Sequence, residues 1–442
     1  MTTDRTSLSY KKIFSFWAPL ASTWLMMSVE GPFLSAIIAR LPEPKYNLAA
    51  YGVVFSLALF MEAPIIMIMS ASTALAKNRD SFLKLRRFTY SLNTLITFCM
   101  GLLLLPPIFN FLMRTLIGLP PEVTRLTHLA CLILLPWPAA IGYRRFYQGI
   151  MIRSNLTRRV AYGTVIRLLS MATVALLLYS FIKNEGVIVG AAALSAGVLM
   201  EAIASGFMSR GSVSRLLSAT KDPLPQTDRI TYGYILKFYY PLALTSILGL
   251  GVHPMVTFFL GHSRMALESL AVFPVINSLV FIFRSIGLSY QEVGIALLGE
   301  NNEGYPQLRN FAFLIGLSAI ASLACLAFTP LASIWYHQVS GLSGVLTRFA
   351  IPPTRIFTLM PGLTVLLSFQ RAVLVNARNT RPITFATLIE VGGIVLVLFF
   401  LTSVLDLIGA VAAAIALVLG RLAANIYLTR PYFLALNRYS FR

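Results

Sequence analysis

The stretch FYQGIMIRSNLTRRVAYGTVIR, residues Phe146–Arg167, occurs a second time in altered form as FQRAVLVNARNTRPITFATLIE, residues Phe369–Glu390. The register is constant, because a shift of 223 takes Thr157 to Thr380. The same shift relates Arg158 to Arg381, Thr164 to Thr387 and Ile166 to Ile389. A single long-range shift of this kind is the mark of an internal repeat. The sequence therefore predicts one structural module used twice.

The repeat extends to both ends of the chain. FWAPLA at residues 16–21 is matched by FYYPLA at residues 238–243, which is a shift of 222. Prolines and glycines then match at 223: Pro107 with Pro330, Pro138 with Pro361, Gly186 with Gly409 and Gly197 with Gly420. We expect the halves to superpose as rigid six-helix units, with residue n on n + 222 in the first two spans and on n + 223 from the third span onward.

The composition is that of a membrane protein. Of 442 residues, 57% are hydrophobic and 12% charged, and the mean hydropathy is +0.76, far from soluble averages. Apolar stretches of about 20 residues recur, and each can cross about 30 Å of hydrocarbon as a helix. A spanning backbone must satisfy its own hydrogen bonds, which leaves helices or closed barrels. Long Leu/Ala/Ile/Val runs without alternation favour helices, so an all-α polytopic protein is predicted.

We predict twelve transmembrane helices as two parallel six-helix repeats, near residues 13–40, 47–76, 89–114, 121–146, 158–183, 186–208, 233–261, 267–298, 307–336, 346–370, 381–405 and 408–430. The repeats form two lobes, 1–208 and 231–442. Residues 209–230, the least apolar stretch, are predicted to be the linker. Six spans per repeat give both repeats the same orientation, which places a binding site near the midplane between them.

The basic residues predict the orientation. With the N-terminus inside, 24 of the 36 Lys and Arg residues fall on that side and seven outside. This asymmetry puts both termini and the linker in the cytoplasm of a plasma (bacterial inner) membrane. The net charge of +20 does not indicate nucleic acid, because the basic loops are short and lack interleaved aromatics. The N-terminal apolar run is too long for a cleaved signal peptide.

Four charges within spans form two pairs across the repeat. A shift of 222 takes Glu62 to Arg284, and a shift of 223 takes Arg167 to Glu390. A charge deep in a bilayer is costly unless it is paired or faces water. One interpretation is that these residues line a central aqueous cavity and bind or gate a solute. The alternative is that they form salt bridges between the halves or reach an interface.

Other ionisable residues carry weaker signals. Glu30 is a candidate for proton or cation coupling, because a carboxylate in a partly dry site can change its protonation during transport; the alternative is an outer vestibule. Arg355, beside paired prolines, either contacts an anion or lies at an edge. Glu201 and Glu292 are expected to be solvated near the cytoplasmic ends of their spans.

Motifs of enzymes and of metal sites are absent from the sequence. No Gly-Lys pair occurs, which excludes a Walker-type ATP site, and neither HExxH nor GxSxG is present. His128 and His253 are interpreted as packed histidines. The three cysteines are isolated within spans and are interpreted as core residues: Cys99, Cys131 and Cys325. The chain is predicted to be no enzyme and to hold no cofactor, with H⁺ or Na⁺ as possible coupling ions.

The architecture resembles a known superfamily. Twelve spans duplicated six by six, short loops, and a turn of NxTR type after the fourth span with its counterpart after the tenth are similar to the multidrug/oligosaccharidyl-lipid/polysaccharide exporter superfamily, which includes MATE transporters. The resemblance implies a V-shaped pair of six-helix lobes and alternating access.

Two pieces resemble the progressive ankylosis (ANK) family more closely. One is FWAPL followed by Glu30 and LAAYGVVFSL..F...P, Leu48–Pro64; the other is FYYPLAL followed by HPMVTFFLGHSR, His253–Arg264, and LAVFPV, Leu270–Val275. This resemblance implies export of small multivalent anions such as pyrophosphate, nucleotides or citrate. Val252 and His253 stand where cation-coupled MATE proteins have an acidic pattern, which argues against sodium coupling and cationic-drug export.

These observations predict a secondary transporter, expected to be a monomer in the lipid bilayer, that exports a small anion. Arg284 is the chief attractant, with Arg167 and Arg355 as helpers. A MATE-like multidrug or cation antiporter, a lipid-linked precursor flippase and a non-transporting scaffold are the alternatives.

Overall fold

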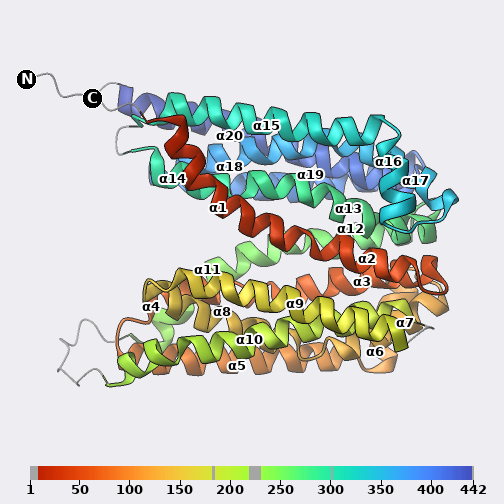
Figure 1. The fold of residues 1–442 in the computed structure, drawn as a ribbon, viewed down its shortest axis with the longest axis horizontal. Coiled ribbons are helices and arrows are strands. Elements are labelled where there is room, and N and C mark those ends of the chain that lie inside the picture. The colour runs from red at the N-terminus through yellow and green to blue at the C-terminus, as the bar shows by residue number, and fades with distance from the viewer. Residues whose placement is uncertain (1–7, 182–184, 219–229, 300–301, 441–442) are drawn as a thin grey trace, which may run out of the picture. The chain divides into compact units, whose positions relative to one another are not determined.

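The computed structural model describes residues 8–181, 185–218, 230–299 and 302–440. The chain packs into two compact units. The N unit is Ile37–Gly261, and the C unit combines Met1–Ala36 with His262–Arg442. Figure 1 labels the helices of both units.

The N unit is built from long helices and short breaks. In chain order these are α3 (Pro44–Glu62), α4 (Ile68–Leu75), α5 (Arg79–Leu103), α6 (Pro106–Asn110), the π-helix η1 (Phe111–Leu116), α7 (Pro121–Ile133), α8 (Trp137–Arg153), α9 (Thr157–Phe181), α10 (Gly186–Ser218), α11 (Tyr232–Leu250) and α12 (Val252–Gly261). Prolines at the start of α3, α6, α7 and α8 fit the first helical turn, where a missing N–H costs nothing.

The C unit is likewise built from long helices separated by short breaks. Its helices are α1 (Tyr10–Ser28), α13 (Ala266–Leu288), α14 (Tyr290–Leu297), α15 (Tyr305–Phe328), α16 (Leu331–Ser333), the π-helix η3 (Ile334–Val339), α17 (Gly344–Ile356), η4 (Phe357–Leu359), α18 (Met360–Asn376), α19 (Arg381–Phe399), η5 (Phe400–Val404) and α20 (Gly409–Ser440). The helix α2 (Glu30–Ala39) crosses the boundary between the units. Within this unit, α15, α18 and α20 run alongside one another (Figure 1).

Helix bounds recur at the shifts that the sequence predicts. Helix α1 begins at Tyr10 and α11 at Tyr232, a shift of 222, while the π-helices begin at Phe111 and Ile334, a shift of 223. The positive φ angles also recur, at Glu43 and Met265, at Gly118 and Gly341, and at Asn155 and Arg378. Agreement in π-helices and positive φ, which are uncommon features, supports the predicted equivalence of the halves.

One hydrogen bond occurs in the same place in both units. The first amides of a helix have no acceptor within it. The Val187 N–H at the start of α10 donates to Asn47 Oδ1 on α3 (2.9 Å), and the Ala410 N–H at the start of α20 donates to Ser269 Oγ on α13 (3.1 Å). The shift of 222 relates the two side chains, and the shift of 223 relates the two amides. The repeat therefore extends from backbone geometry to specific side-chain contacts.

The first helix of each sequence half packs with the opposite half. Helix α1 contacts α13, α14 and α15, whereas α11 contacts α3, α4 and α5. Trp17 Nε1 donates to Ile286 O (3.4 Å), and Tyr239 Oη donates to Pro64 O (2.6 Å). The predicted lobes, 1–208 and 231–442, follow chain order, whereas the compact units exchange these first helices. Helix α10 extends to Ser218, inside the predicted linker, and residues 219–229 lie outside the described residues.

Among the described residues, eight helical segments are long and apolar enough to cross a membrane, and ten if each of two bent helix pairs counts as one span. The protein is therefore an all-helical multi-span membrane protein. The predicted spans at 13–40 and 47–76 correspond to α1–α4, which are not among the ten. Helix α1 carries Lys11 and Lys12 in its first turn, and α3 ends at Glu62 while α4 begins only at Ile68.

Labelling from one side of the membrane tests the predicted orientation. Arg215 on α10 is exposed, so an Arg215→Cys variant, with Cys99, Cys131 and Cys325 replaced by alanine, should react with a membrane-impermeant maleimide only from the cytoplasmic side. The positive-inside rule gives this expectation, because the stretch 209–229 carries four basic side chains. An Arg348→Cys variant, on the predicted outer side, is the control and should react only from outside. If position 215 reacted only from outside, the orientation of the protein in the membrane would be the opposite of the predicted one.

Candidate functional site

A buried carboxylate organises the charges of the N unit. Glu201 on α10 is 1% exposed and forms an ion pair with Arg144 on α8, while its other oxygen accepts a hydrogen bond from Gln148 Nε2 (3.0 Å). Arg167 Nη1 on α9 lies 3.9 Å from the same carboxylate. We call Glu201, Arg144, Arg167 and Gln148 the Glu201 cluster. The sequence predicts a solvated Glu201, and this prediction is wrong because α8, α9 and α10 close around the carboxylate.

Glu62 lies beside this cluster at the end of α3. It is 6% exposed, and its Oε2 accepts a hydrogen bond from Trp137 Nε1 (2.9 Å). The guanidinium groups of Arg144, Arg145 and Arg167 are close enough to act on it electrostatically. Three arginines thus share two carboxylates. Opposite charges supply the compensation that buried ions need.

The C unit holds a second cluster with fewer acidic groups. Glu390 on α19 accepts a hydrogen bond from Arg421 Nε on α20 (2.7 Å), and these side chains are 13% and 11% exposed. Arg284 on α13 and Arg371 on α18 both interact electrostatically with this pair. We call these four residues the Glu390 cluster. Three guanidinium groups face one carboxylate, which leaves two positive charges in excess.

Two of these guanidinium groups have buried nitrogens without partners. Among the described residues, the Nε atoms of Arg284 and Arg371 have no hydrogen-bond acceptor. Arg371 Nη2 donates to Thr387 Oγ1 (3.3 Å), and Arg421 Nη1 donates to Thr364 Oγ1 (3.2 Å). No carboxylate within the described part of the chain lies within salt-bridge distance of Arg284. An unsatisfied buried donor costs about 1–3 kcal/mol, so this cluster has unused capacity to bind an anion.

Glycines let the clustered helices approach closely. A Cβ at Gly197 on α10 would come within 3.0 Å of the carbonyl oxygen of Arg167, and a Cβ at Gly420 on α20 within 2.9 Å of the carbonyl oxygen of Glu390. Such distances are shorter than ordinary contacts. The shift of 223 relates the two glycines and also the two residues that they face. The helix pairs α9–α10 and α19–α20 therefore place opposite charges at equivalent positions.

The four charges paired by the repeat are brought together within units. Glu62 lies in the electrostatic range of Arg167 in the N unit, and Arg284 in that of Glu390 in the C unit. Five members of these clusters were not predicted as site residues from the sequence: Glu201, Arg144, Gln148, Arg371 and Arg421. Arg421 could have been found from the sequence, because it is an isolated cation in the apolar run AAAIALVLGRLAA.

The remaining predicted residues lie elsewhere. Glu30 is buried at the start of α2. Arg355 on α17 donates from Nε to Ala327 O (3.2 Å) and lies 5.4 Å from the Phe328 ring centroid, so it contacts α15 instead of the Glu390 cluster. His128 Nε2 lies 2.8 Å from Leu104 O, as expected of a packed histidine. Within the described residues, no three His, Cys, Asp or Glu side chains could hold a metal ion.

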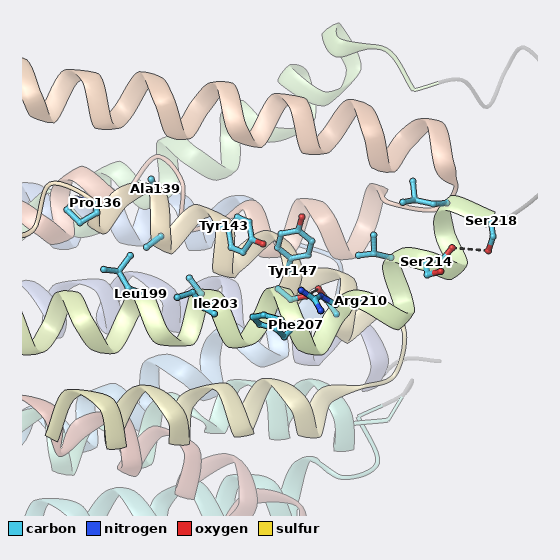
Figure 2. A pocket seen from close by; sticks show the side chains of 16 residues that line it. Pro136, Ala139, Tyr143, Tyr147, Leu199, Ile203, Phe207, Arg210, Ser214 and Ser218 are labelled. Carbon is cyan, nitrogen blue, oxygen red and sulfur yellow. Dashed lines mark hydrogen bonds between the residues drawn. The ribbon is translucent and has the colours of Figure 1, made fainter. Parts of the chain in front are cut away.

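A groove of about 1010 Å³ lies on the N unit between α8 and α10. Figure 2 shows Tyr143 and Tyr147 of α8 and Ile203, Phe207 and Arg210 of α10 lining it. On α8, Tyr143 lines this groove while the next residue, Arg144, contacts Glu201. The groove and the Glu201 cluster are therefore on different faces of the same helix.

Comparisons with known proteins identify the fold. No protein-family model and no curated protein sequence matches the chain. Among solved structures, an inward-facing multidrug resistance MATE family transporter of the MOP superfamily matches with a TM-score of 0.71 and 17% identity, covering 96% of this chain and 99% of that one. The lipid II flippase MurJ, in an inward closed conformation, matches with a TM-score of 0.68 and 14% identity over 97% of this chain and 90% of that one.

A third similar structure is a MOP superfamily transporter from Pyrococcus furiosus, for which a reverse polarity of the binding pocket suggests a different function. It has a TM-score of 0.64 and 18% identity, and the match covers 97% of this chain and 96% of that one. The chain therefore has the MATE-like fold of the MOP superfamily.

Proposed function

We propose that the protein is a gradient-driven transporter that exports a small multivalent anion, of pyrophosphate, nucleotide or citrate type, by alternating access between two six-helix lobes. One observation carries this proposal: the Glu390 cluster has three arginines and one carboxylate. Arginine suits this role, because its planar donors match phosphate and carboxylate oxygens in pairs. Twelve spans and a site near the midplane follow from the repeat.

Arg284 is the first contact in this proposal. Its guanidinium has a buried Nε without an acceptor, and it lacks the direct ion pair that Arg421 has with Glu390. A bound anion would supply that acceptor and compensate the excess charge. Arg371 and Arg421 would complete the site, with the hydroxyl groups of Thr364 and Thr387 beside them. Glu390 would then compete with the anion for Arg421, which allows release.

Glu62 is assigned a role in pH dependence, separate from anion binding. A Glu62→Gln variant keeps a carbonyl oxygen that can accept the Trp137 hydrogen bond, but it cannot take up a proton. We expect transport to continue with an altered pH profile, because proton uptake beside Arg144 and Arg145 would no longer accompany the cycle. Initial rates between pH 5 and 9 measure this, with the exposed Glu292→Gln as control. An unchanged profile in both variants would remove Glu62 from the mechanism.

A lipid-linked precursor flippase is the second candidate, because an open groove on the N unit contains both apolar and charged side chains and the similar MurJ is a lipid II flippase. A MATE-like multidrug or cation antiporter fits the fold but not the excess of arginine.

Flux in proteoliposomes separates these candidates. Purified protein is tested with labelled pyrophosphate, citrate, an organic cation and a fluorescent lipid-linked phosphate. The proposal expects flux of a multivalent anion and none of the cation. Flux of the cation alone, or of the lipid alone, would favour the corresponding alternative.

A further inference from the structure

We propose that the groove between α8 and α10 binds one anionic phospholipid, with its headgroup at Arg210 and an acyl chain along Ile203 and Leu199. This site differs from the Glu390 cluster, which lies in the other unit, and the inference does not depend on which solute is transported. It rests on the shape of the groove, on its polarity and on the order of its residues along α10.

The apolar part of the groove is open to its surroundings. Ile203 and Phe207 are 50% and 56% exposed, although both are large hydrophobic side chains. Apolar side chains open in this way are stable beside hydrocarbon and costly beside water. The groove contains residues from Leu199 to Ser218 on α10, a rise of about 28 Å along the helix. Of this length, about 17 Å separates Arg210 from Leu199, which matches the hydrocarbon depth of about 15 Å in one leaflet, so an acyl chain fits between them.

The other end of the groove is polar and positively charged. Arg210 lies there with Ser209 and Ser214, and no acidic residue belongs to the part of the groove that the structure describes. The guanidinium carbon of Arg210 lies 3.9 Å from the Phe207 ring centroid, a cation–π contact that holds the charge above the apolar wall. Figure 2 shows Arg210 beside Phe207 on α10. A phosphate diester would meet this charge while its chain follows the apolar wall.

Two tyrosines of α8, Tyr143 and Tyr147, line the groove between its apolar and polar parts (Figure 2). Tyr147 Oη on α8 lies 3.0 Å from Tyr90 Oη on α5, and the Tyr143 and Tyr147 ring centroids are 4.6 Å apart. Arg210 acts electrostatically on Tyr143, and Arg86 on Tyr147. Tyrosine and arginine are the side chains that anchor proteins at headgroup depth. The Arg210 guanidinium in the groove, with no acidic side chain among the described lining residues, favours an anionic headgroup over a zwitterionic one.

The topology agrees with this depth. Arg210 lies on the predicted cytoplasmic side, where basic residues are concentrated, and the cytoplasmic leaflet carries anionic lipids. Helix α10 thus runs from an apolar interior, at Leu199, to a basic interface at Arg210. The order of side chains in the groove matches the order of groups in a phospholipid.

Native mass spectrometry tests the proposal. Purified protein is incubated with an equimolar mixture of phosphatidylglycerol and phosphatidylcholine, and retained lipids are counted. The wild type should retain one phosphatidylglycerol in preference to phosphatidylcholine. Arg210→Ala should lower that retention about fivefold, since one basic residue near a membrane surface contributes about 1 kcal/mol. Ile203→Trp should lower retention of both lipids, because the indole fills the groove.

Matched controls separate this site from general lipid contact. Arg215→Ala removes an exposed arginine of the same helix that does not line the groove. Leu176→Trp on α9 changes a side chain that is 54% exposed, close to the 50% of Ile203. Both controls should retain lipid as the wild type does. Equal retention by Arg210→Ala and the wild type, or no preference for phosphatidylglycerol, would overturn the proposal. When a lipid-linked phosphate is added as a third component, its retention in preference to phosphatidylglycerol would assign the groove to a transported lipid.

Discussion

Replacing Arg284 with alanine is expected to abolish anion transport while leaving a folded protein in the membrane. Truncating one partner of a buried charge pair costs about 2–5 kcal/mol, so anion binding should weaken by roughly thirtyfold to several thousandfold. The protein itself should not lose stability. Among the described residues Arg284 has no carboxylate in salt-bridge contact, and its Nε lacks an acceptor, so removing it relieves a desolvation cost.

This combination of effects is measurable in one preparation. Initial rates of anion flux in proteoliposomes should fall to background, while the midpoint of thermal unfolding should stay the same or rise. Arg309→Ala is the matched control, because Arg309 is an exposed arginine of the same unit on α15. Normal flux in Arg284→Ala at equal reconstitution would show that the cluster does not bind the substrate. Loss of flux together with a large loss of stability would make Arg284 a structural residue.

Replacing Glu201 with alanine should have the largest effect on stability. The change leaves Arg144 and Arg167 in the interior of the N unit without their carboxylate and removes the acceptor of Gln148. Removing one partner of a buried ion pair costs about 3–5 kcal/mol, a large part of the stability of a typical protein. We expect a lowered unfolding midpoint in detergent and reduced amounts of protein in the membrane.

A double variant tests whether the loss of stability comes from leaving a buried arginine without its carboxylate. Replacing both Glu201 and Arg144 with leucine should recover much of the stability, because apolar residues can substitute for a buried pair at little cost. Glu122→Ala is the control, since Glu122 forms an exposed pair with Arg125 that should contribute about 1 kcal/mol or less. A Glu201→Ala protein as stable as the Glu122→Ala protein would show that the cluster contributes nothing to folding.

The repeat allowed much of the fold to be predicted from sequence. A constant shift carries helix bounds from one half to the other, and features as local as the positive φ of Glu43 and Met265 follow it. The exchange of α1 and α11 between the compact units could not be predicted in this way. A repeat relates positions along the chain, whereas the partner of a helix depends on which surfaces pack.

The candidate site was predicted only in part. The repeat singled out Arg284 and Glu390, because each is matched by a residue of opposite charge in the other half. Hydrophobicity placed the end of the predicted span 346–370 one residue before Arg371, so Arg371 was left outside the span. In the structure Arg371 belongs to α18 and interacts with the Glu390–Arg421 pair. Hydrophobic patterns locate spans only approximately, and they say little about which side chains of different helices meet. The Glu390 cluster depends on the packing of α13, α18, α19 and α20, and the Glu201 cluster on that of α8, α9 and α10.

Equilibrium binding of a labelled multivalent anion to the purified protein tests the arginine site apart from any transport step. We predict that the wild type binds one pyrophosphate or citrate per chain with an affinity that falls as salt rises, because the interaction is between charges. We predict no saturable binding to Arg284→Ala and wild-type binding to Arg309→Ala. Equal binding by the wild type and Arg284→Ala, or no binding of any multivalent anion to the wild type, would contradict the assignment of the Glu390 cluster as an anion site.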